Sequence, residues 1–150
     1  MLSRCHGVEA GSDLDRARLC GVFCGLVYLI RDLGLALRQG RALLPLAFLR
    51  ERGLRREDLL AGGTGHGTIA DLLGRLAETA RALDARSDPC RLPPALAMRQ
   101  RILRALLEEI EAAGFSVRDQ RIGLTPLRKL WIAWRARHRC RAWSPDERGR

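Results

Sequence analysis

One short stretch of the sequence combines residue types that could hold an anion. In residues 28–45, YLIRDLGLALRQGRALLP, an apolar helical run ends at Arg31 and Asp32, and Arg38 and Arg41 follow one to two turns later. Guanidinium groups bind anionic head groups through paired hydrogen bonds and need no metal to do so. The carboxylate beside them could equally form a structural ion-pair cluster with these arginines, and on sequence alone we favour this second interpretation.

The other reactive residue types form weaker patterns. Cys20 and Cys24 are one helical turn apart, but the chain has no C-x-x-C motif and only three histidines, so we expect buried free thiols rather than a metal site. The five cysteines are an odd number and favour a reducing compartment over a disulfide framework. His6, His66 and His138 fall in expected terminal or loop contexts, and no G-x-S-x-G motif occurs, so hydrolase chemistry has little support.

Helical periodicity dominates the elements that must position these residues, and no stretch shows the alternation of a β-strand. Hydrophobic residues make up 47% of the chain and few are aromatic, so the core is expected to be mostly Leu and Ala, which favours helices. Capping signals and glycines mark the ends of the expected helices. In chain order, these are long helices over about 13–38, from 68 to a break at 87–94, and over about 95–113, with two short segments after Pro45, a loop at 62–67, an irregular stretch at 115–124 and a last helix from Thr125.

The length of 150 residues predicts a single domain with a real core. The first residues, MLSRCHG, contain no apolar segment of the kind found in signal peptides. The longest apolar run, residues 19–30, has twelve residues, whereas a spanning helix needs about twenty, so we expect a buried helix. We therefore expect a cytoplasmic protein with a disordered tail at 142–150.

Positive charge is concentrated near the end of the chain. The net charge is +10, and residues 118–150 contain ten Lys or Arg against three Asp or Glu. On a helix, Trp131 and Trp134 would share an apolar side with Leu127 and Leu130, while arginines at 128, 135 and 139 lie on another side.

This arrangement allows peripheral contact of Trp131 and Trp134 with an anionic membrane, or stacking on a nucleic acid. We favour a third interpretation, in which the helix docks its tryptophan side on the bundle. No nucleic-acid-binding motif occurs, so no specific nucleic acid is expected as a partner.

Two longer segments resemble the squalene/phytoene synthase family. GLVYLIRDLGLALRQGRALLPLAFLRERGLRREDLLAG resembles the family's second aspartate-rich region, and RILRALLEEIEAAGFSVRDQRIGLTPLRKLWIAW looks like its closing segment. The two occur in the family's order and cover about Val8 to Trp134. The resemblance implies an all-α bundle of the isoprenoid, head-to-head trans-prenyltransferase type. Of that bundle the chain would supply the C-terminal half, as one partial domain over 1–150.

The resemblance also implies a chemistry and a site. Enzymes of this family join two prenyl diphosphates head to head in isoprenoid biosynthesis, and they use Mg²⁺ held by two facing aspartate-rich helices. Mg²⁺ prefers hard oxygen ligands and bridges carboxylate to phosphate. By this resemblance Asp32 is a metal ligand. The implied diphosphate-binding residues are Arg31, Asp32, Arg38 and Arg41, and the implied cavity-lining residues are Gly21, Gly25 and Tyr28.

The sequence departs from the family pattern at several of these positions. The family reads roughly Gln-x-x-Asn-x-x-Arg-Asp-x-x-x-Asp, whereas this chain has Gly25 for the Gln, Tyr28 for the Asn and Ala36 for the second Asp. Arg31 and Asp32 match. No D-x-x-x-D occurs upstream of Asp32. One carboxylate without a partner is a poor Mg²⁺ site.

Two functions therefore remain open. The first is a transferase that is catalytically incomplete alone, uses Mg²⁺ and takes its missing half from elsewhere. The second is a non-catalytic pseudoenzyme that needs no cofactor and binds lipid or a protein partner, for example in respiratory complex I assembly. We lean towards no independent turnover. A half-bundle would expose the face of Gly21, Gly25, Tyr28 and Asp32, which predicts an open apolar groove or a protein partner that covers it.

Overall fold

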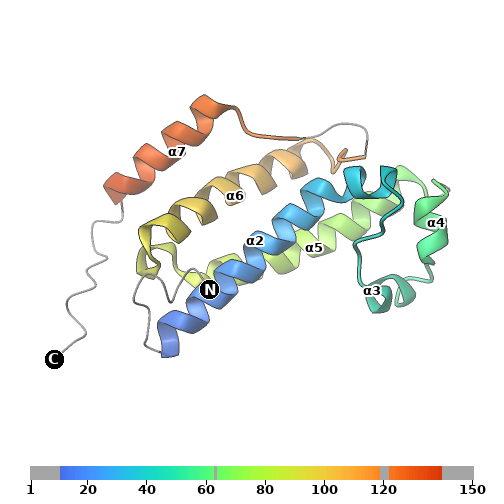
Figure 1. Cartoon of the computed structure of the whole chain (residues 1–150), viewed down its shortest axis with the longest axis horizontal. Helices are drawn as coiled ribbons and strands as arrows, with labels where there is room; N and C mark the ends of the chain where they lie inside the picture. Colours follow the sequence, from blue (N-terminus) through green and yellow to red (C-terminus); the bar gives the residue numbers. More distant parts are fainter. Residues whose placement is uncertain (1–10, 63, 119–121, 140–150) are drawn as a thin grey trace.

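The computed structural model describes residues 11–62, 64–118 and 122–139, and this part of the chain is helical with no β-strand (Figure 1). The expected all-α fold is confirmed. The expected tail at 142–150 and His6 lie outside the described residues. The elements are α2 (Gly11–Arg38), α3 (Leu46–Arg50), α4 (Arg56–Leu60), α5 (His66–Ser87), η1 (Pro89–Arg91), α6 (Pro94–Ala112) and α7 (Pro126–Arg139).

The long helix α2 is the centre of the bundle. It packs along α5 on one side and against α6 on another, while α7 lies along the outer side of α6 (Figure 1). Its buried stripe follows the helical repeat, so one side of the helix is apolar along most of its length. The buried large side chains of this stripe are Phe23, Val27, Ile30, Leu33 and Leu37.

The partner helices bury the residues that periodicity predicted. On α5, Leu72, Leu73 and Leu76 are buried, and on α6 the same is true of Leu103 and Leu107. Leu83, which lies at the same helical spacing on α5, is only half-buried. Together these side chains and the α2 stripe form one continuous core.

Helix ends agree with the sequence expectations to within about two residues. Helix α2 ends at Arg38, and Gly40 takes a φ of +70° while the Arg41 amide donates to the Ala36 carbonyl at 2.8 Å. This is the glycine-terminated helix end that the sequence predicted. Helix α5 starts at His66 instead of Thr68. The expected loop position of His66 is therefore wrong, because His66 is the first residue of α5, whereas His138 lies in the terminal helix α7.

Helix α2 is also the one helix in the described part of the chain that is long and apolar enough to cross a membrane by length and composition. The candidate span covers Asp13–Arg38, and 44% of its apolar window is buried inside the fold. Since α2 packs on both α5 and α6, its apolar stripe is accounted for by the core.

Helix α7 does not pack with the side that we expected. Its tryptophan side is exposed, with Trp131 at 53% and Trp134 at 61% of full exposure. Ala136 is buried and Ile132 and Ala133 are half-buried, so the opposite side faces α6. The docking of the tryptophan side on the bundle is therefore wrong, because small and β-branched residues allow closer approach to α6 there.

A close backbone approach fastens the far end of α2 to the segment after α6. A Cβ placed on Gly34 would collide with the Val117 carbonyl oxygen and lie 2.8 Å from the Cα of Arg118. Nearby, Arg38 Nη1 donates to the Arg118 carbonyl at 2.6 Å. The side chain of Arg118 reaches on to the Thr64 carbonyl at 3.2 Å. Only glycine allows this contact at position 34.

We expect Gly34→Ala to lower the free energy of unfolding by about 1–3 kcal/mol, because the new methyl group must displace buried backbone. The matched control is Gly25→Ala in the same helix, where an added Cβ meets nothing within 4 Å. That change should stabilise by about 0.5–1 kcal/mol through helix propensity. Denaturant unfolding followed by far-UV circular dichroism measures both. Equal stabilities of the two variants would contradict the close approach.

Candidate functional site

The middle of α2 carries a tight ion pair between adjacent residues. Arg31 Nε and Nη2 donate to Asp32 Oδ1 and Oδ2 at 2.8 and 2.6 Å. The guanidinium group also lies 4.8 Å from the centre of the Tyr28 ring. The hydrogen bonds to Asp32 raise the pKa of Arg31 above its ordinary value and outweigh the opposing effect of burial. Arg31 therefore stays charged, and both carboxylate oxygens of Asp32 already accept from it.

The other two arginines of the predicted cluster lie further along, at the end of α2 and just beyond it. Arg38 donates to the Arg118 carbonyl, and Arg41 Nη2 donates to Gln39 Oε1 at 2.5 Å. Arg41 and Asp32 line the same shallow cleft of about 170 Å³. The lining residues of this cleft are Asp32, Leu35, Ala36, Gln39, Arg41 and Leu43. The structure thus brings Arg41 near Asp32, whereas Arg38 serves to hold the 118 segment.

The three residues that the resemblance placed along a cavity have different surroundings. Gly21 and Gly25 are exposed, and a Cβ on either would meet nothing within 4 Å. Tyr28 is half-buried and lines a cleft. Ala36, at the position of the family's second aspartate, is buried. The glycines therefore form an open surface on α2 rather than the lining of a pocket in the described part of the chain.

A larger cleft of about 380 Å³ lies beside Tyr28 and Arg31. Its other walls come from α6, from the segment 122–124 and from Lys129 at the start of α7. The apolar members of the lining are Ile102, Leu103, Leu106, Ile122 and Leu124. Two cations with an apolar floor suit a ligand that has an anionic head and a hydrocarbon tail.

Sequence reasoning did not place Lys129 in this site. It lies 98 positions after Arg31, and no local pattern connects them. The one feature of the sequence that could have drawn attention to Lys129 is its residue type, because it is the single lysine among 27 basic residues. A lysine and an arginine are both suited to phosphate, the first as a point charge and the second as a bidentate donor.

The side chains of the described residues do not form a ligand set that fits Mg²⁺. Within the described residues, no group of three or more His, Cys, Asp or Glu side chains could hold a metal ion. On the α2 face the carboxylate is Asp32, and its oxygens accept from Arg31 at hydrogen-bond distance. Mg²⁺ requires several oxygen ligands in octahedral geometry, so the residues described would have to be joined by carboxylates from elsewhere.

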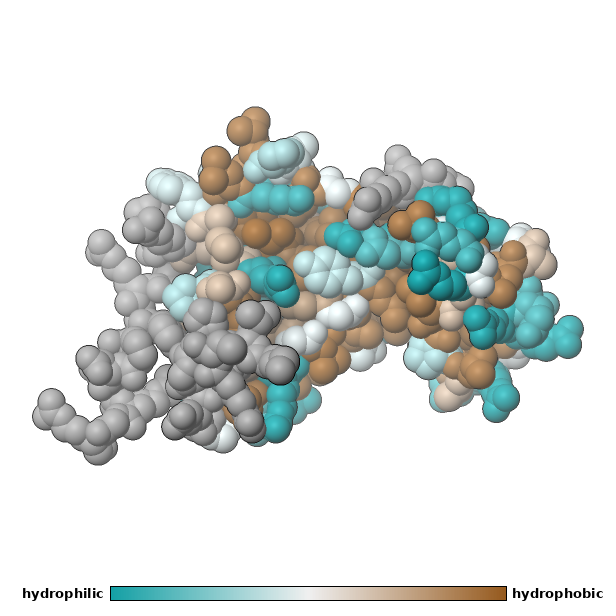
Figure 2. All heavy atoms as spheres, viewed as in Figure 1, coloured by the Kyte–Doolittle hydropathy of each residue, from teal (hydrophilic) through white to brown (hydrophobic). Residues whose placement is uncertain are grey.

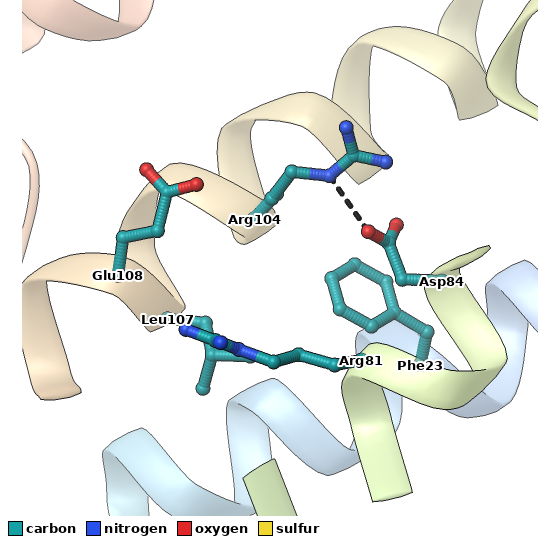
Figure 3. A pocket seen from close by; sticks show the side chains of 6 residues that line it. All are labelled: Phe23, Arg81, Asp84, Arg104, Leu107 and Glu108. Carbon is teal, nitrogen blue, oxygen red and sulfur yellow. Dashed lines mark hydrogen bonds and ion pairs between the residues drawn. The ribbon is translucent and has the colours of Figure 1, made fainter. Parts of the chain in front are cut away.

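A second polar cluster lies between α5 and α6 beside a pocket of about 250 Å³ (Figure 3). Figure 3 shows Arg104 of α6 reaching across to Asp84 of α5, next to the Phe23 ring, with Arg81 and Glu108 on the opposite side of the pocket. The distance from Arg104 Nε to Asp84 Oδ2 is 2.6 Å. Arg104 and Asp84 thus form an ion pair at this pocket, and Arg81 pairs with Glu111 of α6.

The same cluster continues into the core. Gln100 is fully buried, and its Nε2 donates to Asp84 Oδ1 at 2.6 Å and to Ser87 Oγ at 2.5 Å. The Ser87 hydroxyl donates in turn to the Asp84 carbonyl at 2.9 Å. Sequence reasoning missed this network, although Gln100 lies at helical spacing from the buried Leu103 and Leu107. We assign it a structural role, because it ties α5 to α6.

Cys20 and Cys24 are buried free thiols, as the sequence predicted. Hydrogen bonding to Cys24, together with burial, raises the pKa of the Cys20 thiol above its ordinary value. The same hydrogen bond lowers the pKa of the Cys24 thiol. Because both thiols are buried away from solvent, we assign the pair to the core rather than to a reactive site.

Comparison with known proteins agrees with the helical architecture. The family model for squalene/phytoene synthase matches residues 1–128. A 15-cis-phytoene synthase from Enterobacter agglomerans is 30% identical over 136 residues, which make up 87% of this chain and 46% of that relative. The chain therefore spans about half the length of the curated relative it matches. No solved structure matches it significantly.

We expect Asp84→Ala to lower the free energy of unfolding by about 2–3 kcal/mol, because it leaves the buried Gln100 amide short of a partner and Arg104 without its carboxylate. The control is Glu78→Ala, which removes an exposed carboxylate from the same helix. That change should alter stability by less than about 0.5 kcal/mol. Thermal or denaturant unfolding measures the difference, and a harmless Asp84→Ala would argue against the network.

Proposed function

The chain belongs to the squalene/phytoene synthase family of isoprenoid metabolism, and from this premise we propose that it is catalytically incomplete by itself. In this proposal it supplies one wall of a prenyl diphosphate site. The other wall, with further carboxylates, comes from a segment outside this chain. The observation that carries the proposal is the state of Asp32, a single carboxylate hydrogen-bonded by Arg31 through both oxygens.

The charge requirement of the family's chemistry explains why that observation matters. Diphosphate leaves an allylic carbon only when metal ions and cationic side chains stabilise the charge that develops on it. The second aspartate position is occupied by Ala36, which is buried and has no ligand atom. A second wall that carries carboxylates is therefore needed to bind Mg²⁺. We expect Mg²⁺ only in the site that both walls complete.

The cleft beside Arg31 supports a binding role for this half of the site. Arg31 and Lys129 supply positive charge at its walls, and the buried Leu103, Leu106 and Leu124 supply an apolar floor. A diphosphate would be attracted by the two cations, and a prenyl tail would cover apolar surface. In this chain these residues would bind and orient the ligand without breaking a bond.

The exposed glycines of α2 mark where the missing wall would approach. Gly21 and Gly25 leave the helix backbone bare on the same side as Tyr28 and Asp32. We propose that a protein segment of the same family covers this surface and contributes its aspartates there. The free buried thiols Cys20 and Cys24 favour a reducing compartment such as the cytoplasm for the assembly.

We expect the purified chain to bind farnesyl diphosphate but to release no diphosphate from it, with or without Mg²⁺. Isothermal titration calorimetry measures binding, and a diphosphate-release assay measures turnover. Lys129→Ala should weaken binding about tenfold, which corresponds to about 1.4 kcal/mol, because one of two cations is lost. Head-to-head condensation by the chain alone would contradict the proposed incompleteness.

The matched control is Arg75→Ala, which removes one positive charge from an exposed position on α5. Arg75 is not among the residues that line the cleft beside Arg31. Its loss should therefore change the affinity for farnesyl diphosphate by less than about twofold, through the long-range electrostatic field of the protein. Equal losses of affinity in the Lys129→Ala and Arg75→Ala variants would mean that binding depends on the net charge of the protein and not on the residues of the cleft.

A second candidate function is supported by the same ion pair. If Arg31 and Asp32 serve only as a paired structural unit, the chain is a non-catalytic relative that binds lipid or a protein partner. Assembly factors for respiratory complex I are an example of such a role within the family. The uncharged Ala36 and the bidentate Arg31–Asp32 contact favour this candidate over a metal-dependent one.

The substitution Asp32→Asn separates the two candidates. In a site without metal, the change frees Arg31 for the ligand, so farnesyl diphosphate should bind up to about tenfold more tightly and independently of Mg²⁺. If the chain is assayed with a co-expressed N-terminal half of the family, so that Asp32 helps to hold Mg²⁺ in a completed site, the same change should weaken binding only when Mg²⁺ is present. Titrations with and without Mg²⁺, on both proteins, measure the difference.

A further inference from the structure

Helix α7 exposes a continuous apolar stripe that the site on α2 does not use. Among the described residues, its four large apolar side chains are some of the most exposed in the molecule. Figure 2 shows hydrophobic side chains projecting at the edge where α7 runs. The exposed fractions are 79% for Leu127, 68% for Leu130, 53% for Trp131 and 61% for Trp134.

Most of the stripe points away from the bundle, and Trp131 at its edge also lines a cleft of about 290 Å³ against α6. Leu127, Leu130, Trp131 and Trp134 fall within about 100° of the helix circumference at 3.6 residues per turn. The buried Ala136, with Ile132 beside it, lies on the other side, where α7 packs on α6. Helix α7 therefore has two apolar sides, one that packs within the fold and one that faces outwards.

Positive charge flanks the outward stripe. Between Pro126 and Arg139 the sequence has five Lys or Arg and no Asp or Glu. The Arg135 guanidinium lies 5.0 Å from the centre of the Trp131 ring, at the border of the stripe. Arg128 is on the same flank and pairs with Glu109 of α6, whereas Lys129 lies on the side of α7 that lines the cleft beside Arg31.

We propose that α7 is an interfacial helix that binds the surface of an anionic lipid bilayer with Leu127, Leu130, Trp131 and Trp134. Tryptophan rings settle at the headgroup level of a bilayer, and leucines reach the boundary of the acyl chains. Arginines beside the stripe keep their guanidinium groups among lipid phosphates while their apolar stems extend along the surface. This inference is independent of the function proposed for the α2 face.

Charge complementarity favours a bilayer over a folded protein partner. The cores of protein interfaces are depleted of charged residues, whereas Arg128 and Arg135 border one side of this stripe. A planar anionic surface can meet the stripe and its arginine flank at once, and each cation near that surface adds to the attraction. The stripe and its cations therefore match a lipid surface in both apolarity and charge.

The test uses the full chain with Trp143→Phe, so that the fluorescence comes from Trp131 and Trp134. We expect it to float with vesicles of phosphatidylcholine containing about 30% phosphatidylserine, to bind neutral vesicles at least about tenfold more weakly, and to lose binding at high salt. Its tryptophan emission should shift to the blue and be quenched by brominated lipids. Tryptophans that stay unquenched would overturn the proposal, even if the protein floats.

Two double variants complete the test. Trp131→Ser with Trp134→Ser should weaken vesicle binding at least about tenfold, because two large apolar side chains leave the bilayer. The control is Val22→Ser with Leu46→Ser, which removes two exposed apolar side chains from α2 and α3 and should leave binding unchanged. Circular dichroism verifies that both variants fold. Equal effects of the two, or self-association through Trp131 and Trp134 without vesicle binding, would overturn the proposal.

Discussion

Burial of one side of helix α2 against α5 and α6 is the interaction on which the rest of this structure depends. Side chains from Phe23 to Leu37 fill the space between the three helices, and at the far end Gly34 lets the backbone of residues 117–118 come into contact. Because that side is committed to the core, the rotation of α2 is fixed. Tyr28, Arg31 and Asp32 are consequently held at the border of the core, half-buried and within reach of the segment before α7.

Electrostatics then decides what this border can do. Two cations face an apolar cleft, but the carboxylate on the same helix is hydrogen-bonded through both oxygens to its neighbour. Such an arrangement attracts a phosphorylated hydrocarbon ligand and holds a divalent cation poorly. The same physical requirement separates the two candidate functions. A transferase needs acidic side chains from a second wall, whereas a binding protein needs only Arg31, Lys129 and the apolar floor.

Polar groups in this fold are used in two distinct ways. Asp84, Gln100 and Arg104 are joined by short hydrogen bonds inside or beside the core, where an unpaired group would be costly, and we regard them as structural. Arg135 of α7 lies instead beside the exposed Trp131, where water or lipid phosphate can satisfy its guanidinium group. Burial thus distinguishes polar residues that hold the bundle from those that are available to a ligand or a membrane surface.

The sequence by itself determined the helical class, the approximate helix ends, the apolar periodicity of α5 and α6 and the family, because these depend on local periodicity and on residues close together in the chain. It also determined that Ala36 replaces a carboxylate. Only the tertiary structure decided that Lys129 joins Arg31, that Gln100 is buried with Asp84, and that the tryptophans of α7 face outwards. Those outcomes depend on which of two apolar sides packs and on contacts between distant segments, and a periodic pattern is the same for either choice.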